Sequence, residues 1–361
     1  MKIIIKYIIF PIMVFLSCYS TNKTFSGKKD NQLIYNDSLN TVNDNKLWKK
    51  SVIHLEGATD SKSWEDRIEQ IQKLQEELNK NKITPEEFSN KMLNGYRDIR
   101  YFGTAIFIEH EKKRYLCTAR HVLYDKVSAK RYLESEKENA ESWPKEMREN
   151  LINSAKISSE TFIFNIIFRI PSFDEIISQP LIKTPEFLMN LGAGPYGIRD
   201  YTFSDPEIDL AIISLDEHNS NFANELISKG YIPINFNKIG ESPTAEGAEV
   251  FTVGYPTTTS ILGELKLQPS EKYWGSSFVS IPTFAFGKVS MLNNNLPFFW
   301  CDISIYPGNS GGPIVEDNKL VGVISAQPVI EKQRVLFAKI IKAKYVRDLL
   351  QIQIMKDKSS F

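Results

Sequence analysis

The chain has 361 residues with 44 basic and 44 acidic side chains, so its formal net charge at pH 7 is zero. This balance gives no reason to expect nucleic acid as a partner, because such proteins usually carry a strongly basic surface. Hydrophobic residues make up 42% of the sequence, and the three cysteines are too few for a disulfide-rich scaffold. The composition therefore indicates an ordinary globular protein, with two compact domains or one large β unit with insertions.

The first 18 residues have the order of features found in an export signal. Lys2 and Lys6 flank the start of an apolar run over residues 3–16. The run is shorter than the roughly 20 residues that span a membrane, so it predicts a signal peptide. Its end, residues 15–18 (FLSC), resembles a bacterial lipobox, in which the cysteine, here Cys18, carries a lipid. A plain cleaved signal and an uncleaved anchor helix are the alternatives.

Residues 19–47 are rich in Asn, Lys, Ser, Thr and Asp, a composition that is typical of a flexible tether. Together with a lipidated Cys18, this tether would hold the rest of the chain off a membrane. We therefore expect an exported protein of the cell envelope, in the periplasm or at the cell surface, with the N-terminal lipid as its membrane contact.

The remaining sequence predicts many short strands and two helical insertions. The insertions cover about residues 61–95 and 130–157, and residues 342–353 predict a closing C-terminal helix. Many short strands separated by turns favour a barrel or a sandwich. Strands are predicted at residues 51–56, 103–108, 114–119, 161–168, 210–215, 249–253, 284–292, 298–303, 320–325 and 335–338.

The most informative segment is residues 307–313 (PGNSGGP). A serine hydroxyl is a weak nucleophile, which needs a base to take its proton and donors to hold the oxyanion. Flanking glycines allow a tight turn, and we assign the oxyanion hole to the N–H groups of Gly308 and Ser310. The pattern also fits the nucleophile turn of α/β-hydrolases, but that fold places its histidine after the serine. This chain has no histidine after His218, so the esterase interpretation fails.

The base must therefore come from one of four histidines. His110 and His218 lie in charged loops, and His54 lies in the first predicted strand, where a structural role suffices. His121 directly follows a predicted strand that ends in residues 117–120 (CTAR). We interpret His121 as the general base.

A carboxylate should orient the far nitrogen of that histidine and stabilise the imidazolium. Asp209 opens an apolar run and so lies at the edge of a strand, with Asp205 and Asp216 as rivals. The resulting order of histidine, aspartate and serine is that of the chymotrypsin class. The predicted triad is His121, Asp209 and Ser310.

Four strings of the sequence resemble bacterial trypsin-like endopeptidases, including the high-temperature-requirement proteases and the glutamyl endopeptidases. The resemblance runs from about residue 48 to 350 and implies a serine endopeptidase that hydrolyses polypeptides through an acyl-enzyme on Ser310. The strings are residues 103–105 (GTA) with 118–121 (TARH), 209–211 (DLA), 254–256 (GYP) and 307–313.

The fold implied by this resemblance is all-β with helical insertions, made of two packed six-stranded antiparallel barrels and a C-terminal helix. Residues 48–220 would form the first barrel with its insertions, and residues 221–361 the second. The first would bring His121 and Asp209 to the cleft, and the second Ser310. The alternative is a catalytically weak protease fold that serves as a binding or sensing module on the envelope, because the insertions could cover the cleft.

Departures from the family pattern qualify the expected activity. Asn309 stands where digestive enzymes have the aspartate that receives a newly cut N-terminus, so activation of that kind is not expected. Ser304 replaces the aspartate at the base of the specificity pocket, so cleavage after Lys or Arg is not expected. The pocket wall is expected from Ser325, Ala326 and Gln327, which suit small or medium apolar side chains.

Two further cysteines, Cys117 and Cys301, each lie in an apolar strand. This placement favours two separately buried thiols over a disulfide. Neither has the neighbouring residues of a metal site. We therefore expect no metal and no cofactor, and the sequence gives no oligomeric state.

Overall fold

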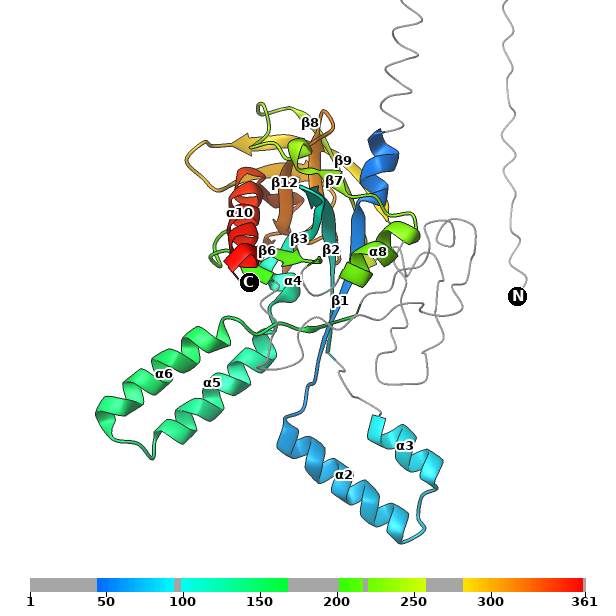
Figure 1. The fold of residues 1–361 in the computed structure, drawn as a ribbon, viewed down its shortest axis with the longest axis vertical. Coiled ribbons are helices and arrows are strands. Elements are labelled where there is room, and N and C mark those ends of the chain that lie inside the picture. The colour runs from blue at the N-terminus through cyan, green and yellow to red at the C-terminus, as the bar shows by residue number, and fades with distance from the viewer. Residues whose placement is uncertain (1–43, 94–98, 168–200, 217–219, 258–281, 360–361) are drawn as a thin grey trace, which may run out of the picture. The chain divides into compact units, whose positions relative to one another are not determined.

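The computed structural model describes most of the chain beyond the N-terminal segment. The predicted signal peptide, Cys18 and residues 19–43 lie outside the described residues. From residue 44 the chain belongs to one compact unit. Among the residues described, no helix is long and apolar enough to cross a membrane. The described residues are 44–93, 99–167, 201–216, 220–257 and 282–359 (Figure 1).

The folded unit begins earlier than the composition predicts. Residues 44–47, expected in the tether, are helical, and the helix continues to residue 50. Trp48 of this helix is fully buried, and its indole Nε1 donates to Oδ1 of Asn318 at 2.9 Å. One large aromatic side chain in a polar stretch therefore anchors the end of the predicted tether.

The first half of the chain forms a seven-stranded sheet. Six strands follow the order β4-β1-β2-β3-β6-β5 with antiparallel neighbours, and β7 pairs in parallel with β2. Among the described strands the sheet is open, with β4 and β5 at its ends. The strands are β1 (Val52–Thr59), β2 (Ile99–His110), β3 (Lys113–Ala119), β4 (Asn165–Ile167), β5 (Tyr201–Phe203), β6 (Leu210–Ser214) and β7 (Ile234–Asn235).

The second half forms a closed barrel of six strands in the order β10-β15-β12-β11-β8-β9, with antiparallel neighbours throughout. A separate short hairpin, β13–β14, lies between β12 and β15 in the sequence. The strands are β8 (Glu249–Gly254), β9 (Thr283–Leu292), β10 (Phe298–Ile303), β11 (Pro313–Glu316), β12 (Lys319–Ala326), β13 (Val329–Ile330), β14 (Gln333–Arg334) and β15 (Phe337–Lys342).

Helices interrupt the sheet of the first half at two places. α2 and α3 separate β1 from β2, and α5 and α6 follow the short helix α4 after β3 (Figure 1). The carboxylate of Asp125 accepts the N–H groups of Val127 and Ser128, so α5 starts at residue 126 rather than near 130. The helices are α2 (Trp64–Asn79), α3 (Pro85–Leu93), α4 (Arg120–Leu123), α5 (Lys126–Ala140), α6 (Lys145–Ser159), α8 (Ser220–Ser228) and α10 (Lys344–Ser359), with a 3₁₀ turn, η1 (Phe236–Lys238).

The two halves share a hydrophobic core. One cluster of buried side chains contains residues of the first sheet, such as Ile106 and Leu210, together with Val253 and Val323 of the barrel and Val346 of α10. Burial of apolar surface stabilises a fold by about 25 cal/mol per Å². This shared cluster is therefore the main interaction that joins the two halves. The sequence prediction of a trypsin-like, mostly β fold with a C-terminal helix is confirmed.

Candidate catalytic site

Asp209 is the residue just before β6, and a local turn sets its orientation. Its backbone N–H donates to the carbonyl of Asp205 at 3.1 Å, and its φ of 54° lies in the left-handed region. Ser204 closes the turn, since its hydroxyl accepts the N–H of Leu210 at 2.8 Å. Aspartate tolerates left-handed backbone better than most residues. The turn therefore places the carboxylate at the start of β6 rather than along the strand.

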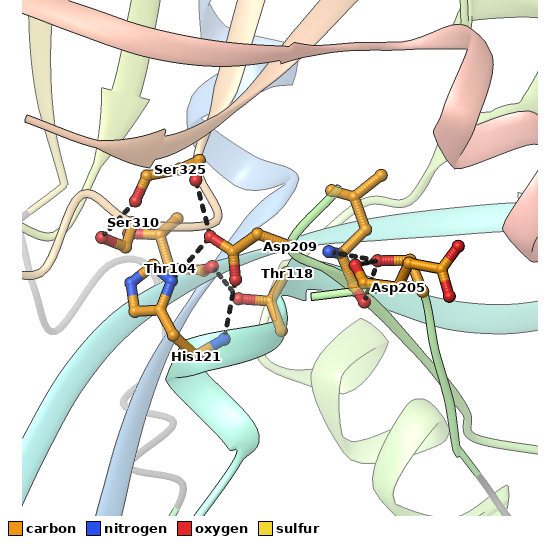
Figure 2. Close-up of polar contacts among 9 residues, drawn as sticks. Thr104, Thr118, His121, Asp205, Asp209, Ser310 and Ser325 are labelled. Carbon is orange, nitrogen blue, oxygen red and sulfur yellow. Dashed lines mark hydrogen bonds and ion pairs between the residues drawn. The ribbon is translucent and has the colours of Figure 1, made fainter. Parts of the chain in front are cut away.

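His121 belongs to α4, the helical turn that follows β3, and it contacts Asp209 at two points. Its ring Nδ1 lies 2.8 Å from Oδ2 of Asp209, and its backbone N–H donates to Oδ1 at 3.0 Å (Figure 2). The carboxylate thereby fixes both the helical turn and the ring. This is the geometry in which a carboxylate keeps the proton on Nδ1 and leaves Nε2 to act as a base.

The rival aspartates make other contacts. The side chain of Asp216 binds the guanidinium and backbone N–H of Arg114, and Asp205 serves the turn through its carbonyl. The other histidines also lie elsewhere: His54 stacks on Tyr255 with ring centroids 5.2 Å apart, and His110 packs on Phe236. His218 lies outside the described residues.

Ser310 lies in the glycine-rich loop between β10 and β11. Two glycines of this loop have positive φ, 97° at Gly308 and 84° at Gly311. A Cβ on Gly308 would overlap the carbonyl of Tyr255, and one on Gly311 would overlap the carbonyl of Thr104. Only glycine fits these two positions, because both the backbone angle and the available space exclude a side chain.

Ser325 connects the serine to the aspartate. Its hydroxyl donates to Oδ2 of Asp209 at 2.6 Å, while its carbonyl accepts the hydroxyl of Ser310 at 3.5 Å. Figure 2 shows the ring of His121 between Asp209 and Ser310, but no hydrogen bond joins the imidazole to the Ser310 hydroxyl in this structure. Catalytic hydrogen bonds are often long without substrate and shorten when it binds.

Two backbone N–H groups of the loop are available to an oxyanion. Those of Gly308 and Ser310 have no acceptor within the described residues, whereas Asn309 N–H donates to the carbonyl of Tyr306 at 3.0 Å and Gly311 N–H to that of Ile324 at 2.8 Å. Paired N–H groups directed at one point are what a developing oxyanion requires. In the part of the chain that the structure describes, the two N–H groups predicted for the oxyanion hole thus have no competing acceptor.

Thr104 of β2 ties the first half of the chain to the serine loop, a role that the sequence does not reveal. Its hydroxyl donates to the carbonyl of Gly308 at 2.7 Å and accepts the N–H of Tyr255 at 3.0 Å. Its backbone N–H donates to the carbonyl of Ser310 at 2.8 Å. The hydroxyl of Thr118 holds the carbonyl of Thr104 at 2.7 Å (Figure 2). The only sequence feature that points to Thr104 is its place in the string at residues 103–105.

The predicted pocket residues have different surroundings. The Ser325 side chain points to Asp209, so it orients the carboxylate in addition to lying beside Ser310. Ser304 and Ala326 are exposed, and the amide of Gln327 donates to the carbonyl of Val335 at 2.9 Å. The substrate pocket itself stays a prediction.

The cysteines lie away from this chemistry. Cys117 and Cys301 are fully buried free thiols in separate clusters of the core. Burial raises the pKa of the Cys301 thiol to about 12 and that of Cys117 still further above its ordinary value. In the part of the chain that the structure describes, no group of three or more His, Cys, Asp or Glu side chains is arranged to hold a metal ion.

A closed antiparallel barrel that carries a glycine-flanked serine, joined to a sheet that carries a paired histidine and aspartate, is the arrangement of the trypsin-like fold. The family model for the trypsin-like peptidase domain matches residues 103–323, more than half of the chain, which therefore belongs to this family. A comparison with curated protein sequences gives no match.

Solved structures that match the chain include HtrA-type proteases. The HtrA-type protease AlgW with a tripeptide is 15% identical with a TM-score of 0.41, and the match covers 86% of this chain and 62% of that one. This chain thus spans less than two thirds of the length of AlgW. The Rv3671c protease in an inactive form is 11% identical with a TM-score of 0.38, and the match covers 87% of this chain and 94% of that one.

Proposed function

We propose that this chain is a serine endopeptidase with His121, Asp209 and Ser310 as its catalytic triad. The observation that carries the proposal is the two-point contact between Asp209 and His121, which leaves Nε2 of the imidazole free to serve as a base. Membership of the trypsin-like peptidase family supports a polypeptide as the substrate.

Acylation would begin with attack of the Ser310 hydroxyl oxygen on the carbonyl carbon of the scissile bond. The hydroxyl proton passes to Nε2 of His121, and Asp209 stabilises the imidazolium that results. The negative charge on the carbonyl oxygen is held by the N–H groups of Gly308 and Ser310. His121 then donates its proton to the leaving amine as the C–N bond breaks, which leaves an ester on Ser310.

Deacylation would use the same groups with water in place of the hydroxyl. His121 takes a proton from the attacking water, the oxyanion forms again at the same two N–H groups, and the proton returns to Oγ of Ser310 as the acyl C–O bond breaks. The products are the carboxylic acid and the free enzyme. Each step moves one proton through His121, so no metal or cofactor is required.

The cleavage preference and the location of the enzyme are part of the same proposal. Ser304, six residues before Ser310 in the sequence, and residues 325–327 support cleavage after small or medium apolar side chains rather than after Lys or Arg. We also propose that Cys18 is lipidated and holds the enzyme at the cell envelope. Mass spectrometry of the N-terminal peptide would test this, because an unmodified Cys18 in protein purified from membranes excludes the lipid anchor.

The test of the activity is labelling of the purified protein with a fluorophosphonate probe. Phosphonylation requires an activated serine, so we expect one labelled site, at Ser310, and no labelling of a Ser310→Ala variant. A Ser228→Ala variant, which changes an exposed serine of α8, is the matched control and should label normally. A peptide library would then give the cleavage preference.

A folded wild-type protein that does not label would reject the activity. That result would favour the second candidate, a catalytically weak protease fold used for binding or sensing on the envelope. The observation that favours this alternative is the pair of helical insertions, α2–α3 and α5–α6, which interrupt the sheet that carries His121 and Asp209.

A further inference from the structure

The peptide bond between Pro307 and Gly308 is held by Thr257, which lies outside the serine loop. The carbonyl oxygen of Pro307 accepts two hydrogen bonds from Thr257, one from the backbone N–H at 2.8 Å and one from the hydroxyl at 3.1 Å. The C=O and N–H of a trans peptide point in opposite directions. Thr257 on one side of this peptide therefore turns the N–H of Gly308 to the opposite side, where it has no acceptor within the described residues.

Gly308 cannot hold this orientation by itself. Glycine adopts positive and negative φ about equally readily, so rotation of the 307–308 peptide meets little resistance from the residue that follows it. The next two carbonyls of the loop have other partners: that of Gly308 accepts from the Thr104 hydroxyl at 2.7 Å, and that of Asn309 from the N–H of Gly312 at 2.9 Å. The peptide that carries the first oxyanion donor thus depends on Thr257.

We propose that Thr257 is a positioning residue that sets the oxyanion hole by fixing the Pro307–Gly308 peptide. The inference rests on the proposed function, since it concerns the donor that Gly308 would give to the oxyanion. The contacts of Thr257 with the serine loop are made to the carbonyl of Pro307, so it acts through this peptide. Its contribution therefore concerns the bond-forming step rather than the binding of the substrate.

The test compares Thr257→Val with Thr257→Ser in the full chain. Valine has nearly the shape of threonine and keeps the backbone N–H, so it removes the hydroxyl bond to Pro307, whereas serine keeps that bond. Reaction with the fluorophosphonate probe over a range of concentrations gives the maximal inactivation rate and the apparent affinity separately. Thr161→Val, which removes a hydroxyl bond to the carbonyl of Ser158 at the end of α6, is the matched control.

We expect Thr257→Val to lower the maximal inactivation rate about tenfold, less than the 10²–10³-fold that loss of a whole oxyanion donor costs. The apparent affinity should change less than about twofold, because the donor acts mainly on the charged, tetrahedral state. Thr257→Ser and Thr161→Val should match the wild type. An unchanged rate in Thr257→Val, or a change in affinity alone, would overturn the proposal.

Crystal structures of the wild type and Thr257→Val decide the positioning role independently of activity. We expect the Pro307 carbonyl to face residue 257 in the wild type and to be rotated or in two orientations in the variant. The same single orientation in both structures would overturn the role of the hydroxyl. Absence of labelling in the wild type would reject the proposed function instead, so the two failures are distinguishable. If Thr257→Val does not fold, Thr257→Ala removes the same bond without the added methyl group.

Discussion

The hydroxyl of Ser325 donates to the same carboxylate oxygen of Asp209 that faces Nδ1 of His121. The two distances are 2.6 Å and 2.8 Å, and the other oxygen of Asp209 accepts the backbone N–H of His121 at 3.0 Å. Three donors thus surround one carboxylate, two from His121 and one from the barrel. A carboxylate that accepts several hydrogen bonds is held in one orientation. The barrel that carries Ser310 therefore also helps to orient the aspartate of the first half.

Substitution of Ser325 by alanine should weaken catalysis without abolishing it. Asp209 would keep both contacts to His121 but lose the third donor, so we expect kcat to fall about tenfold, which corresponds to about 1.4 kcal/mol. KM for a peptide substrate should stay within about twofold, because the hydroxyl faces the carboxylate rather than the substrate. Steady-state kinetics of Ser325→Ala, with Ser228→Ala as the control variant, measure kcat and KM. A rise in KM at constant kcat would mean that Ser325 acts through the pocket wall.

Asp209→Asn should inactivate the enzyme while preserving its fold. Asparagine adopts left-handed backbone as readily as aspartate, so the φ of 54° remains acceptable. The neutral amide cannot stabilise the positively charged imidazolium, and it can favour the wrong tautomer of His121. We therefore expect kcat to fall on the order of 10⁴-fold. Thermal unfolding and peptide hydrolysis are the two measurements. A variant that keeps more than about a tenth of the wild-type kcat would show that another carboxylate does the work.

The sequence predicted the segments that carry His121, Asp209 and Ser310 because their local patterns are strong. The apolar run after residue 209 and the glycine-rich string around Ser310 each identify a position directly. The strands and the two helical insertions follow from the periodicity of their apolar residues. These features depend on neighbours in the chain and can be found without a structure.

Contacts between distant segments could not be predicted in this way. The partners of Thr104 lie 151 and 204 residues away, at Tyr255 and Gly308. Ser325 was assigned to the pocket wall, but its side-chain partner, Asp209, is 116 residues away. Such roles depend on how the two halves pack, which no local pattern encodes. Residues 44–47 are helical rather than part of the predicted tether for the same reason. The next residue of that helix, Trp48, donates a hydrogen bond to Asn318 of the barrel, far away in the sequence.

Loss of the Thr104 hydroxyl should destabilise the whole protein. Thr104→Val would leave the Gly308 carbonyl and the Tyr255 N–H buried without a partner, at about 1–3 kcal/mol each. Thr104→Ser keeps both bonds and loses one methyl group, at about 0.8 kcal/mol. Urea denaturation should therefore give a free energy of unfolding lower by about 2–6 kcal/mol for valine and by less than about 1 kcal/mol for serine. Equal stability of the two variants would contradict the bridging role.

Gly311→Ala should cost far more stability than Gly247→Ala, although the two glycines have nearly the same φ, 84° and 82°. A Cβ at Gly247 meets nothing within 4 Å, whereas one at Gly311 would overlap the Thr118 hydroxyl and the Thr104 carbonyl. The backbone strain, about 1–2 kcal/mol, is common to both variants. Steric overlap of the new Cβ should add about 1–3 kcal/mol or more to the loss of stability at Gly311 alone. Urea denaturation of the two variants measures this difference. A difference below about 1 kcal/mol would mean that the loop moves away from β2 and β3 at little cost.

The buried thiols should be unreactive in the folded enzyme and fully reactive when it unfolds. The thiolate is the reactive form, and burial raises the pKa of Cys301 to about 12 and that of Cys117 further, so almost no thiolate exists at pH 8. Iodoacetamide should therefore leave both residues unmodified in the native protein and alkylate both in urea without any reductant. Peptide mapping separates Cys117, in the tryptic peptide 115–120, from Cys301. Alkylation in urea only after a reductant is added would show that the two residues had formed a disulfide, which would require the strands that carry them, β3 and β10, to approach each other across the two halves.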